Sequence, residues 1–579
     1  MDLKIGADQP TDDERSAIDT ALGDPSSSWR GGDRTAADQH VAHGAGTRVQ
    51  RHRLLPSLHA INDRIGWISP GAVNYLATRL DIAPAEIYGV ATFYGLFSTT
   101  ERVGPQLHVC VDLACQIAGI TPADAHAAGG HESPCLGLCE RAPARMLVEP
   151  GLEPRMSVAP DPPVVAAIPQ AGDPSLVLLA RIGVVDPESL DSYRAHGGYE
   201  ALAKAFEMGA AAVIEQITAS GLSGRGGAAF PTGRKWATVA AQPVATHHLV
   251  CNADESEPGT FKDRVLMEGD PFALIEAITI AAFATGCQQG WIYLRGEYPL
   301  ARQRLTNAIR QARAAGLLGT DISGRGFDFD VQVFVGAGAY ICGEETAIFN
   351  SIEGFRGEPR NKPPFPVEVG LFGQPTLVNN VETLVNVLPI VRDGGSAYAA
   401  IGTGTSSGTK LFCLSGAVAR PGVYEVPFGI TLRELIDLAG GVPAAHELRA
   451  VMLGGAAGSF ATPDDLDVPL TFEGTRAAGL SLGSGVVMVL DETVDLVAFV
   501  RRIAAFFRDE SCGQCVPCRV GTVRQEEVLV RLESGRQLAG DRQLLVDIGR
   551  VMRDSSICGL GQTAYNAIES ALSKLGVLS

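Results

Sequence analysis

The chain has 579 residues, of which 46% are hydrophobic and 19% charged, a composition typical of a globular protein. Its length is too great for a single core and suggests about four domains. With 47 basic and 65 acidic residues the net charge is −18, which argues against a protein that binds nucleic acid through its phosphates.

Hydropathy and the amino-terminal segment indicate where the protein is located, and the location suggests what its cysteines do. The sequence contains no run of about 18 apolar residues, so we expect no membrane-spanning helix. The polar amino-terminal segment lacks the apolar core of a signal peptide, which favours a cytoplasmic location. In that compartment the 12 cysteines indicate metal or redox chemistry rather than structural disulfides.

The amino-terminal third divides into a tail and a small domain. Residues 1–47 are rich in Asp, Ser, Gly and Ala and show little apolar periodicity, which predicts a mobile tail. From Leu54 to Ile87 apolar residues recur at helical spacing, and Leu107–Val111 is typical of a short strand. We therefore expect a domain over residues 48–170, with helices followed by a small α/β unit.

The middle of the chain, residues 171–405, alternates short strands with helices. His248–Cys251 and Trp291–Leu294 are typical of buried strands, and Pro271–Ala284 is typical of a helix between them. Phe329–Val335 predicts a further strand. This alternation indicates a parallel α/β domain.

The last two predicted domains differ in character. Residues 406–490 form a small β-rich domain, with strands at Lys410–Leu414 and Val423–Val426 and a helix that begins with the capping box Thr431–Glu434. Residues 491–579 are mainly helical, because apolar residues recur there at steps of three and four.

A group of cysteines near the carboxyl terminus is typical of a cubane iron–sulfur site. Cys512, Cys515 and Cys518 have C-x2-C-x2-C spacing, and Cys558 is available as a distant fourth ligand. A zinc site more often pairs two C-x2-C units, and the second pair is missing here. The spacing favours a 4Fe–4S cluster, with zinc or inert thiols as weaker alternatives.

A second group of cysteines has wider gaps. Cys110 and Cys115 are spaced C-x4-C, and Cys135 and Cys139 are spaced C-x3-C, which favours a 2Fe–2S centre held between two loops. Zinc remains the alternative for this group. The other cysteines lie singly in apolar or glycine-rich surroundings and are predicted to be core thiols: Cys251, Cys287, Cys342 and Cys413.

Two loops have the composition of a nucleotide site. The segment from Gly221 to Trp236 is rich in glycine, which lets backbone amides approach a phosphate, although such a loop alone is often a simple turn. The acidic segment from Asn252 to Asp263 follows a predicted strand, where open α/β sheets bind ligands. Its carboxylates would accept hydrogen bonds from ribityl or ribose hydroxyls and repel a 2′-phosphate, favouring NAD over NADP. The alternative is a solvated acidic loop.

Three further segments add polar groups. Gly336–Thr346 follows a strand and opens a predicted helix, whose start is stabilised by carboxylates even without a ligand. Arg360–Pro366 supplies a cation and an aromatic ring in a stiff segment, which is also typical of a surface connection. Asn379–Thr383 places two amides together. The joint occurrence of these segments in one α/β domain is more specific than any one of them.

Together these motifs resemble a known family, the flavin-bearing NADH dehydrogenase subunit of respiratory complex I and its soluble relatives. The motifs are Gly224-Arg-Gly-Gly, Asn252-x-Asp-Glu, Gly336-Ala-Gly-Ala-Tyr-Ile-Cys-Gly-Glu-Glu345, Lys362-Pro-Pro-Phe-Pro, Asn379-Asn-Val-Glu-Thr and Ser511-Cys-Gly-Gln-Cys-x-Pro-Cys-Arg519. The region before Cys139 resembles the small 2Fe–2S subunit of the same systems, here fused in front. The fused arrangement is similar to the β (diaphorase) subunit of soluble NAD-dependent formate dehydrogenases, and NAD-reducing hydrogenases use a like subunit.

The resemblance, which covers about residues 50–579, implies a multidomain α/β and α+β protein. It implies a thioredoxin-like 2Fe–2S domain, a Rossmann-like FMN domain, a β-grasp-like domain and a carboxyl-terminal helical bundle with a 4Fe–4S cluster. It places FMN near Gly224, Arg225, Gly226, Lys235, Asn252, Asp254, Glu255, Ser256, Tyr340, Gly343, Glu344, Asn379 and Asn380. It places NAD near Phe230, Glu257, Glu345, Lys362 and Phe365.

The chemistry implied by this resemblance is conversion between paired and single electrons. A flavin accepts a hydride from NADH and releases electrons one at a time to iron–sulfur clusters, so no side chain need act as a general acid or base. In a formate dehydrogenase, electrons would come from a molybdenum- or tungsten-containing α subunit with further iron–sulfur clusters, and NAD+ would be reduced here. The alternatives are a hydrogenase, a complex I-type quinone reductase, or a non-catalytic electron-transfer or zinc-stapled module.

Overall fold

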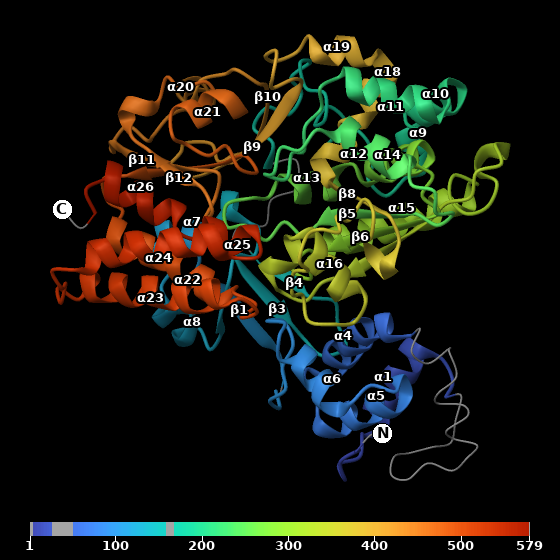
Figure 1. Ribbon diagram of the computed structural model, residues 1–579, viewed down its shortest axis with the longest axis horizontal. Coiled ribbons are helices and arrows are strands. Elements are labelled where there is room, and N and C mark those ends of the chain that lie inside the picture. The colour runs from blue at the N-terminus through green and yellow to red at the C-terminus, as the bar shows by residue number, and fades with distance from the viewer. Residues whose placement is uncertain (1–3, 26–49, 103, 158–166, 578–579) are drawn as a thin grey trace.

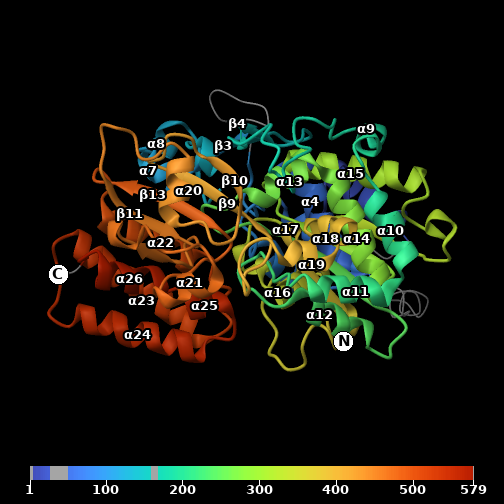
Figure 2. The same cartoon turned by 90° about the horizontal axis from the view of Figure 1, so that it is seen from above.

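The computed structural model of the protein describes residues 4–25, 50–102, 104–157 and 167–577. Figures 1 and 2 agree in placing the small β domain and the carboxyl-terminal helices on one side of the molecule and the α/β domain on the other. The amino-terminal helices lie at one end, below the α/β domain in Figure 1. Among the described residues, no helix has both the length and the apolarity needed to cross a bilayer.

The chain begins with a group of helices, the first of which lies in the segment predicted to be a mobile tail. The helices are α1 (Asp12–Leu22), α4 (Leu54–Ile65), α5 (Pro70–Leu80) and α6 (Pro84–Ala91). Residues 12–22, expected in a mobile tail, instead form α1. Thr11 and Glu14 cap this helix reciprocally, while Ile18 and Leu22 are buried. The rest of the predicted tail, from residue 26 onward, lies outside the described residues.

The next domain has a four-stranded sheet that carries the first cysteine group. Its strands are β1 (Gln106–Cys110), β2 (His131–Ser133), β3 (Arg145–Val148) and β4 (Arg155–Ser157), and its helices are α7 (Leu113–Ile117) and α8 (Pro122–Ala127). The strand order is β2-β1-β3-β4, with β1 parallel to β2 and antiparallel to β3. The predicted strand at Leu107–Val111 is therefore confirmed.

The α/β domain is built on a four-stranded parallel sheet, as the alternation of strands and helices predicts. Its strands are β5 (His248–Ala253), β6 (Gln289–Leu294), β7 (Asp330–Val335) and β8 (Thr376–Asn380). The order is β7-β6-β5-β8, so the chain moves outward from β5 to β7 and then returns to the other side of β5. This reversal creates a topological switch point between β5 and β8, where open α/β sheets bind ligands.

Helices surround this sheet on both faces. They are α9 (Leu190–Ala195), α10 (Glu200–Met208), α11 (Ala210–Ala219), α12 (Thr232–Ala240), α13 (Lys262–Gly269), α14 (Pro271–Thr285), α15 (Pro299–Ala314), α16 (Glu345–Ile352), α17 (Val381–Val385), α18 (Val387–Asp393) and α19 (Gly395–Ala399). The helix predicted between the first two strands of the sheet is α14, and nearly all of its side chains are buried.

The small β domain has a five-stranded sheet with a different apolar layer on each face. Its strands are β9 (Thr409–Gly416), β10 (Gly422–Pro427), β11 (Leu448–Leu453), β12 (Ser459–Ala461) and β13 (Val486–Asp491), in the order β10-β9-β13-β11-β12. Phe412 and Leu414 pack beneath α20 (Leu432–Leu438) and its neighbours, whereas Leu411 and Cys413 join the main core. Side chains of β9 alternate between the two faces of the sheet, so one face packs within the domain and the other packs against the rest of the molecule. The helix α21 (Phe472–Ala477) completes it.

The carboxyl-terminal region is helical, as predicted. Its helices are α22 (Leu496–Asp509), α23 (Val516–Glu533), α24 (Asp541–Ser555), α25 (Gly559–Thr563) and α26 (Asn566–Lys574). The apolar face of α22 that the sequence predicts, including Phe499 and Ile503, is fully buried. The pattern therefore identified the face that packs against the core.

A buried group of charges joins the α/β domain to the small β domain. Glu382 in α17 accepts hydrogen bonds from Lys410 Nζ at 2.7 Å and from the backbone amide of Leu411 at 2.9 Å, and Lys262 Nζ lies 3.1 Å from its carboxylate. All three charged side chains are at most 1% exposed. Lys410 Nζ also donates to the carbonyl of Ser484 at 3.0 Å. These bonds fix how the two sheets meet.

We predict that Glu382→Gln strongly destabilises the protein, because it leaves two buried lysines without their shared carboxylate. Breaking a buried ion pair from one side costs about 3–5 kcal/mol. Arg433→Gln is the control, because the Arg433–Asp467 pair is exposed and such pairs contribute roughly 0–1 kcal/mol. Calorimetric unfolding of both variants checks this, and equal shifts in the transition temperature would contradict it.

Candidate functional site

A cavity of about 400 Å³ lies beyond the carboxyl ends of β5 and β8. It collects predicted residues from four segments of the chain that are distant in sequence. The predicted residues that line it are Gly226, Asn252, Asp254, Glu255, Ser256, Glu257, Tyr340, Gly343, Glu344 and Asn380. Most of the predicted FMN positions therefore come together at the topological switch point.

Two asparagines mark the strand ends at this point. Asn252 and Asn380 are register partners on β5 and β8, so the two side chains emerge side by side. Asn252 Nδ2 donates to the carbonyl of Gly343 at 2.9 Å, and Asn380 Nδ2 donates to Asp263 Oδ2 at 2.6 Å. These bonds link the loops after three strands of the sheet.

The cavity lining contains buried acceptors with no partner among the described residues. They are Asp254 Oδ2, Asn380 Oδ1 and Ser484 Oγ. A buried polar atom without a hydrogen bond is costly, so a ligand with hydroxyl or amide donors would stabilise this arrangement. The ribityl chain and ring of FMN carry such donors, and the residues present therefore fit this cofactor.

The glycine-rich loop forms part of the cavity wall, where the absence of side chains on Gly226 and Gly227 leaves room for a ligand. A Cβ atom added at Gly226 would lie 3.1 Å from Asn380 Cβ, and Gly227 has a φ of +113°, which a side chain would strain. The side chain of Arg225 is directed elsewhere. Its guanidinium donates to Ser407 O at 2.7 Å and to Tyr398 Oη at 3.0 Å, so it braces the loop from behind.

Burial changes the acidity of the carboxyl groups in the cavity. It raises the pKa of Asp254 and of Glu257 to about 7. Asp254 accepts a hydrogen bond from Ser256 Oγ at 2.7 Å, and Glu257 accepts one from Tyr340 Oη at 2.5 Å. These groups are therefore poised to be neutral or charged near neutral pH, depending on the donors that a ligand supplies.

Several predicted residues form a charged group beside the cavity. Lys362 Nζ lies 2.8 Å from one oxygen each of Glu344 and Glu345, and Lys235 Nζ lies 3.9 Å from the other oxygen of Glu345. Of these residues only Glu344 lines the cavity. Phe230, whose ring lies 5.7 Å from Lys235 Nζ, is 44% exposed. The predicted NAD residues Phe230, Glu345 and Lys362 thus lie outside the cavity lining, whereas Glu257 is part of it.

Three other predicted residues lie outside the cavity lining. Asn379 Oδ1 accepts a hydrogen bond from Trp236 Nε1 at 2.9 Å, so its side chain supports α12 rather than the cavity. Gly224 donates its amide to Phe230 O at 2.9 Å within the glycine-rich turn. Phe365 is 52% exposed in the proline-rich segment.

Much of the cavity wall was not predicted from the sequence. The lining residues that were not assigned individually are Gly227, Ala228, Thr260, Lys262, Asp263 and Ile341, which lie inside the predicted loops, and Gly454, Ala457, Ser481, Ser484, Gly559, Leu560, Thr563 and Asn566, which lie outside them. The small β domain and the carboxyl-terminal helices supply the later ones, and Asn566 Nδ2 donates to the carbonyl of Ala457 at 3.1 Å. The Gly454-Gly455 pair directly after a predictable strand was the available signal for this wall.

The carboxyl-terminal cysteines converge at helix starts. Cys515 is the N-cap of α23, Cys518 lies in the first turn of that helix, and Cys558 is the N-cap of α25. A Cβ atom at Gly561 would lie 2.9 Å from Cys518 Cβ, which shows that the two segments are in contact. Helix amino termini stabilise the negative charge of thiolate ligands. This arrangement fits an iron–sulfur cluster.

The four amino-terminal cysteines are all buried and close together. Cys135 Sγ lies 3.4 Å from Cys139 Sγ, and backbone amides of Gly137 and Ala144 donate to Cys135 Sγ and Cys115 Sγ at 3.4 Å. Hydrogen bonds from Cys110 and Cys139 lower the pKa of the Cys135 thiol. Buried thiols with amide donors to sulfur fit a 2Fe–2S centre.

The cavity lies between the two cysteine groups. Gly559 and Leu560, which follow Cys558 directly, form part of its wall. On the other side, the Arg295 guanidinium donates both to the carbonyl of Glu255, a cavity residue, and to that of Cys135. A cofactor in the cavity would therefore be close to both groups.

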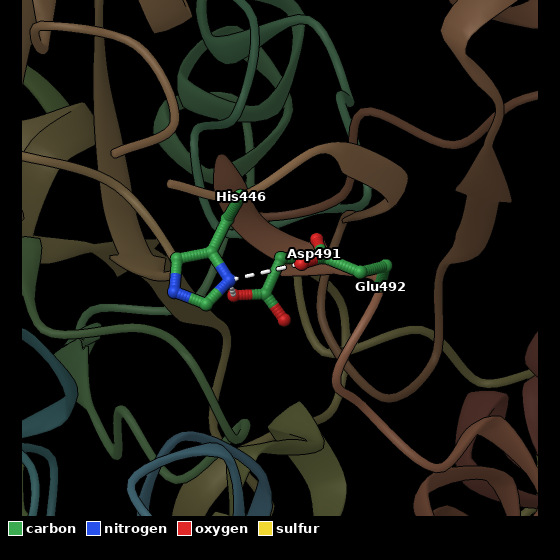
Figure 3. Close-up of side chains that lie close together, drawn as sticks. All are labelled: His446, Asp491 and Glu492. Atoms are coloured by element: carbon green, nitrogen blue, oxygen red, sulfur yellow. Dashed lines mark hydrogen bonds and ion pairs between the residues drawn. The ribbon is translucent and has the colours of Figure 1, made fainter. Parts of the chain in front are cut away.

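A further cluster of titratable side chains lies in the small β domain, away from the cavity lining. His446 Nδ1 is 3.1 Å from Glu492 Oε1 and 3.5 Å from Asp491 Oδ2 (Figure 3). The carboxylates also accept bonds from Thr493 and from the backbone amide of Glu447. This cluster fixes the loop before β11 to the end of β13.

Four models of known families match separate stretches of the chain. Family models match as follows: Thioredoxin-like [2Fe-2S] ferredoxin at residues 39–128, Nuo51 FMN-binding domain at 217–389, SLBB domain at 411–458 and NADH-ubiquinone oxidoreductase-F iron-sulfur binding region at 498–576. These matches define a multidomain oxidoreductase flavoprotein with two iron–sulfur regions.

Sequence identity to individual relatives shows the family to which the chain belongs. The chain is 46% identical over 391 residues to the NADP-reducing hydrogenase subunit HndC of Solidesulfovibrio fructosivorans, covering 67% of this chain and 80% of that one. It is 44% identical over 390 residues to an NADH-quinone oxidoreductase subunit of Escherichia coli, covering 67% and 88%. The chain belongs to this family of NADH dehydrogenase-type flavoprotein subunits and carries FMN-binding, 2Fe–2S and 4Fe–4S domains.

A solved structure matches nearly the whole chain. The crystal structure of an NAD+-reducing [NiFe]-hydrogenase in the air-oxidised state contains a chain 33% identical, with a TM-score of 0.76. The match covers 90% of this chain and 92% of that chain. The fused arrangement of domains therefore has a counterpart in that structure.

We predict that the FMN-free protein loses stability as the pH rises from about 4 to 7. Asp254 and Glu257 hold protons up to a pKa of about 7 in the folded state, whereas unfolded carboxyl groups release them near pH 4. Between these values the folded state binds more protons, so the free energy of unfolding falls with rising pH. Thermal unfolding at several pH values measures this.

Asp254→Asn should flatten this pH dependence because it removes one of the carboxyl groups whose pKa burial raises. Asp330→Asn is the control, because Asp330 is half-exposed and pairs with Arg313 on the surface. FMN should also flatten the dependence by donating to the carboxylates. The same slope in the parent protein and Asp254→Asn would contradict the assignment.

Proposed function

We propose that this chain is the diaphorase subunit of a soluble NAD-dependent formate dehydrogenase, which exchanges hydride between NAD and FMN and passes single electrons through iron–sulfur clusters. The observation that carries the proposal is the acceptor-lined cavity at the switch point, enclosed between the two cysteine groups. FMN, when bound there, supplies the exchange between paired and single electrons.

The ligand sets proposed for the clusters follow the two cysteine groups. Cys512, Cys515, Cys518 and Cys558 would hold the 4Fe–4S cluster, and Cys110, Cys115, Cys135 and Cys139 would hold the 2Fe–2S cluster. Their convergence at helix starts and within a buried loop pair supports both sets.

The residues proposed for FMN fall into two roles. Asp254 and Asn380 offer unpaired acceptors to a polar ligand, and Gly226 leaves room for its close approach. Asn252 ties the loop after β5 to Gly343 and so positions the acidic loop. The remaining FMN positions that the resemblance implies, among them Gly224, Arg225, Lys235 and Asn379, would act by supporting these loops.

The nucleotide is proposed to bind at the outer side of the cavity. Glu345 and Lys362 form an ion pair there, and Phe230 and Phe365 present exposed rings. Glu257, fixed by Tyr340 and by the amide of Ala457, would orient the nicotinamide end. These residues would hold the two rings in reacting geometry, and orientation of this kind contributes much of the rate.

The proposed electron source is formate, oxidised in a partner subunit that contains molybdenum or tungsten and further iron–sulfur clusters. The resemblance of the fused chain to formate dehydrogenase β subunits supports this donor, and we propose a cytoplasmic location for the complex. A second candidate donor is H2, which the match along 90% of the chain to an NAD+-reducing hydrogenase favours. A quinone-reducing complex is the third candidate setting, given the similarity to NADH-quinone oxidoreductase subunits.

We predict that Cys558→Ala abolishes the 4Fe–4S signal in electron paramagnetic resonance while NADH still bleaches the bound FMN. The iron content should fall from about six atoms per chain, four from one cluster and two from the other, to about two. Cys287→Ala is the matched control, because this buried thiol bonds to His248 O at the amino-terminal end of the sheet, away from the cavity. An unchanged spectrum in Cys558→Ala would overturn the ligand set.

The donor is decided by assaying the complex purified from its native cells with formate and with H2, while monitoring NADH formation. We expect formate to support NAD+ reduction and H2 to support none. The reverse result would assign the chain to a hydrogenase. Failure of NADH to bleach a bound flavin would reject the diaphorase function itself.

A further inference from the structure

A buried arginine connects the flavin loop with the loop of the 2Fe–2S cysteines. Arg295 follows β6 directly, at the carboxyl edge of the parallel sheet, and is 2% exposed. Its Nη1 donates to the carbonyl of Glu255 at 2.7 Å, and its Nη2 donates to the carbonyl of Cys135 at 2.5 Å. One planar cation therefore spans two domains and touches both loops.

The negative partner of Arg295 lies two residues along the chain. Glu297 accepts hydrogen bonds from Arg295 Nη2 at 2.9 Å and from Nε at 3.2 Å, and it is itself 3% exposed. The aromatic ring of Tyr298 lies 4.9 Å from the guanidinium carbon. These contacts fix the guanidinium in one orientation, and only a side chain with several donors in a planar fork can bond to all of these acceptors.

Other contacts hold the same cysteine loop from three sides. Arg264 Nε donates to the carbonyl of Gly137 at 3.0 Å, and a Cβ atom at Gly137 would lie only 2.3 Å from Tyr298 Oη. The backbone amide of Cys135 donates to Asp112 Oδ2 at 3.2 Å, and Arg502 from α22 contacts the other oxygen of Asp112. Residue 135 is therefore held through both its amide and its carbonyl.

We propose that Arg295 is a positioning residue that links the flavin loop to Cys135 and sets the reduction potential of the 2Fe–2S cluster. This inference rests on the proposed function, because it takes Cys135 as a cluster ligand. Reduction adds one negative charge to the cluster. A buried cation bonded to a ligand residue stabilises that charge, and the opposing carboxylate of Glu297 reduces the effect.

The two charges give predictions of opposite sign. Arg295→Gln removes the cation and leaves the Glu297 carboxylate buried beside the loop, so the reduced cluster becomes less favourable. Glu297→Gln removes the carboxylate and leaves the cation, so the reduced cluster becomes more favourable. Arg295→Lys keeps the charge and loses the fork, so its shift should be smaller than that of Arg295→Gln.

The experiment is a redox titration of the holoprotein, following the 2Fe–2S signal by electron paramagnetic resonance. At the midpoint potential of the parent protein, we expect Arg295→Gln to lower the ratio of reduced to oxidised cluster about tenfold, which corresponds to 59 mV for one electron. The 4Fe–4S signal in the same samples should keep its midpoint. Arg181→Gln is the control, because this partly buried arginine pairs with Asp270, away from both loops.

The outcomes separate this inference from the proposed function. If the parent protein shows no 2Fe–2S signal, the proposed function fails. If the signal is present but Arg295→Gln and Glu297→Gln leave its midpoint unchanged, or shift both clusters equally, only the role of Arg295 fails. Should Arg295→Gln not fold, the upward shift in Glu297→Gln and the downward shift in Arg295→Lys decide the question.

Discussion

The ion pairs between Glu382 and the lysines 262 and 410 are the constraint on which the site depends. The cavity has walls from three regions of the chain, so its shape depends on how those regions meet. Lys410 bonds both to Glu382 in the α/β domain and to the carbonyl of Ser484 in the cavity wall. A buried ion pair tolerates little change in geometry, which makes it suited to this task.

The same cavity brings together buried carboxyl groups and acceptor atoms that destabilise the protein when no ligand donates hydrogen bonds to them. Asp254 and Glu257 are carboxyl groups in a site where burial penalises charge, and acceptor atoms of the lining are unpaired. A ligand with several hydroxyl groups relieves both problems at once. The site is therefore already arranged for its cofactor, and the protein without cofactor is less stable for that reason.

Much of this organisation was predictable from the sequence, and the failures have definite causes. Cysteine spacing predicted both cysteine groups, because ligand spacing is a local property. Asn252 was predictable from its place after a predicted strand, whereas Asn380 was named only through the family resemblance because strand β8 was not predicted. The direction of the Arg225 side chain was not, because a glycine-rich motif fixes the backbone and not where a long side chain finds its acceptors. The wall residue Thr563 comes from a helix whose docking only the tertiary structure defines. The helix at residues 12–22 was missed because its three buried apolar residues, Ala17, Ile18 and Leu22, stand among many polar neighbours.

Where the cysteine loop meets the α/β domain, arginines of that domain bond to carbonyls of the loop. Between separate subunits such a contact would have to supply enough affinity to survive dilution. Here both partners belong to one polypeptide, so the effective concentration of one domain for the other is high at any protein concentration. The junction can therefore carry buried charged groups beside the cysteine loop without having to supply the affinity of an independent interface.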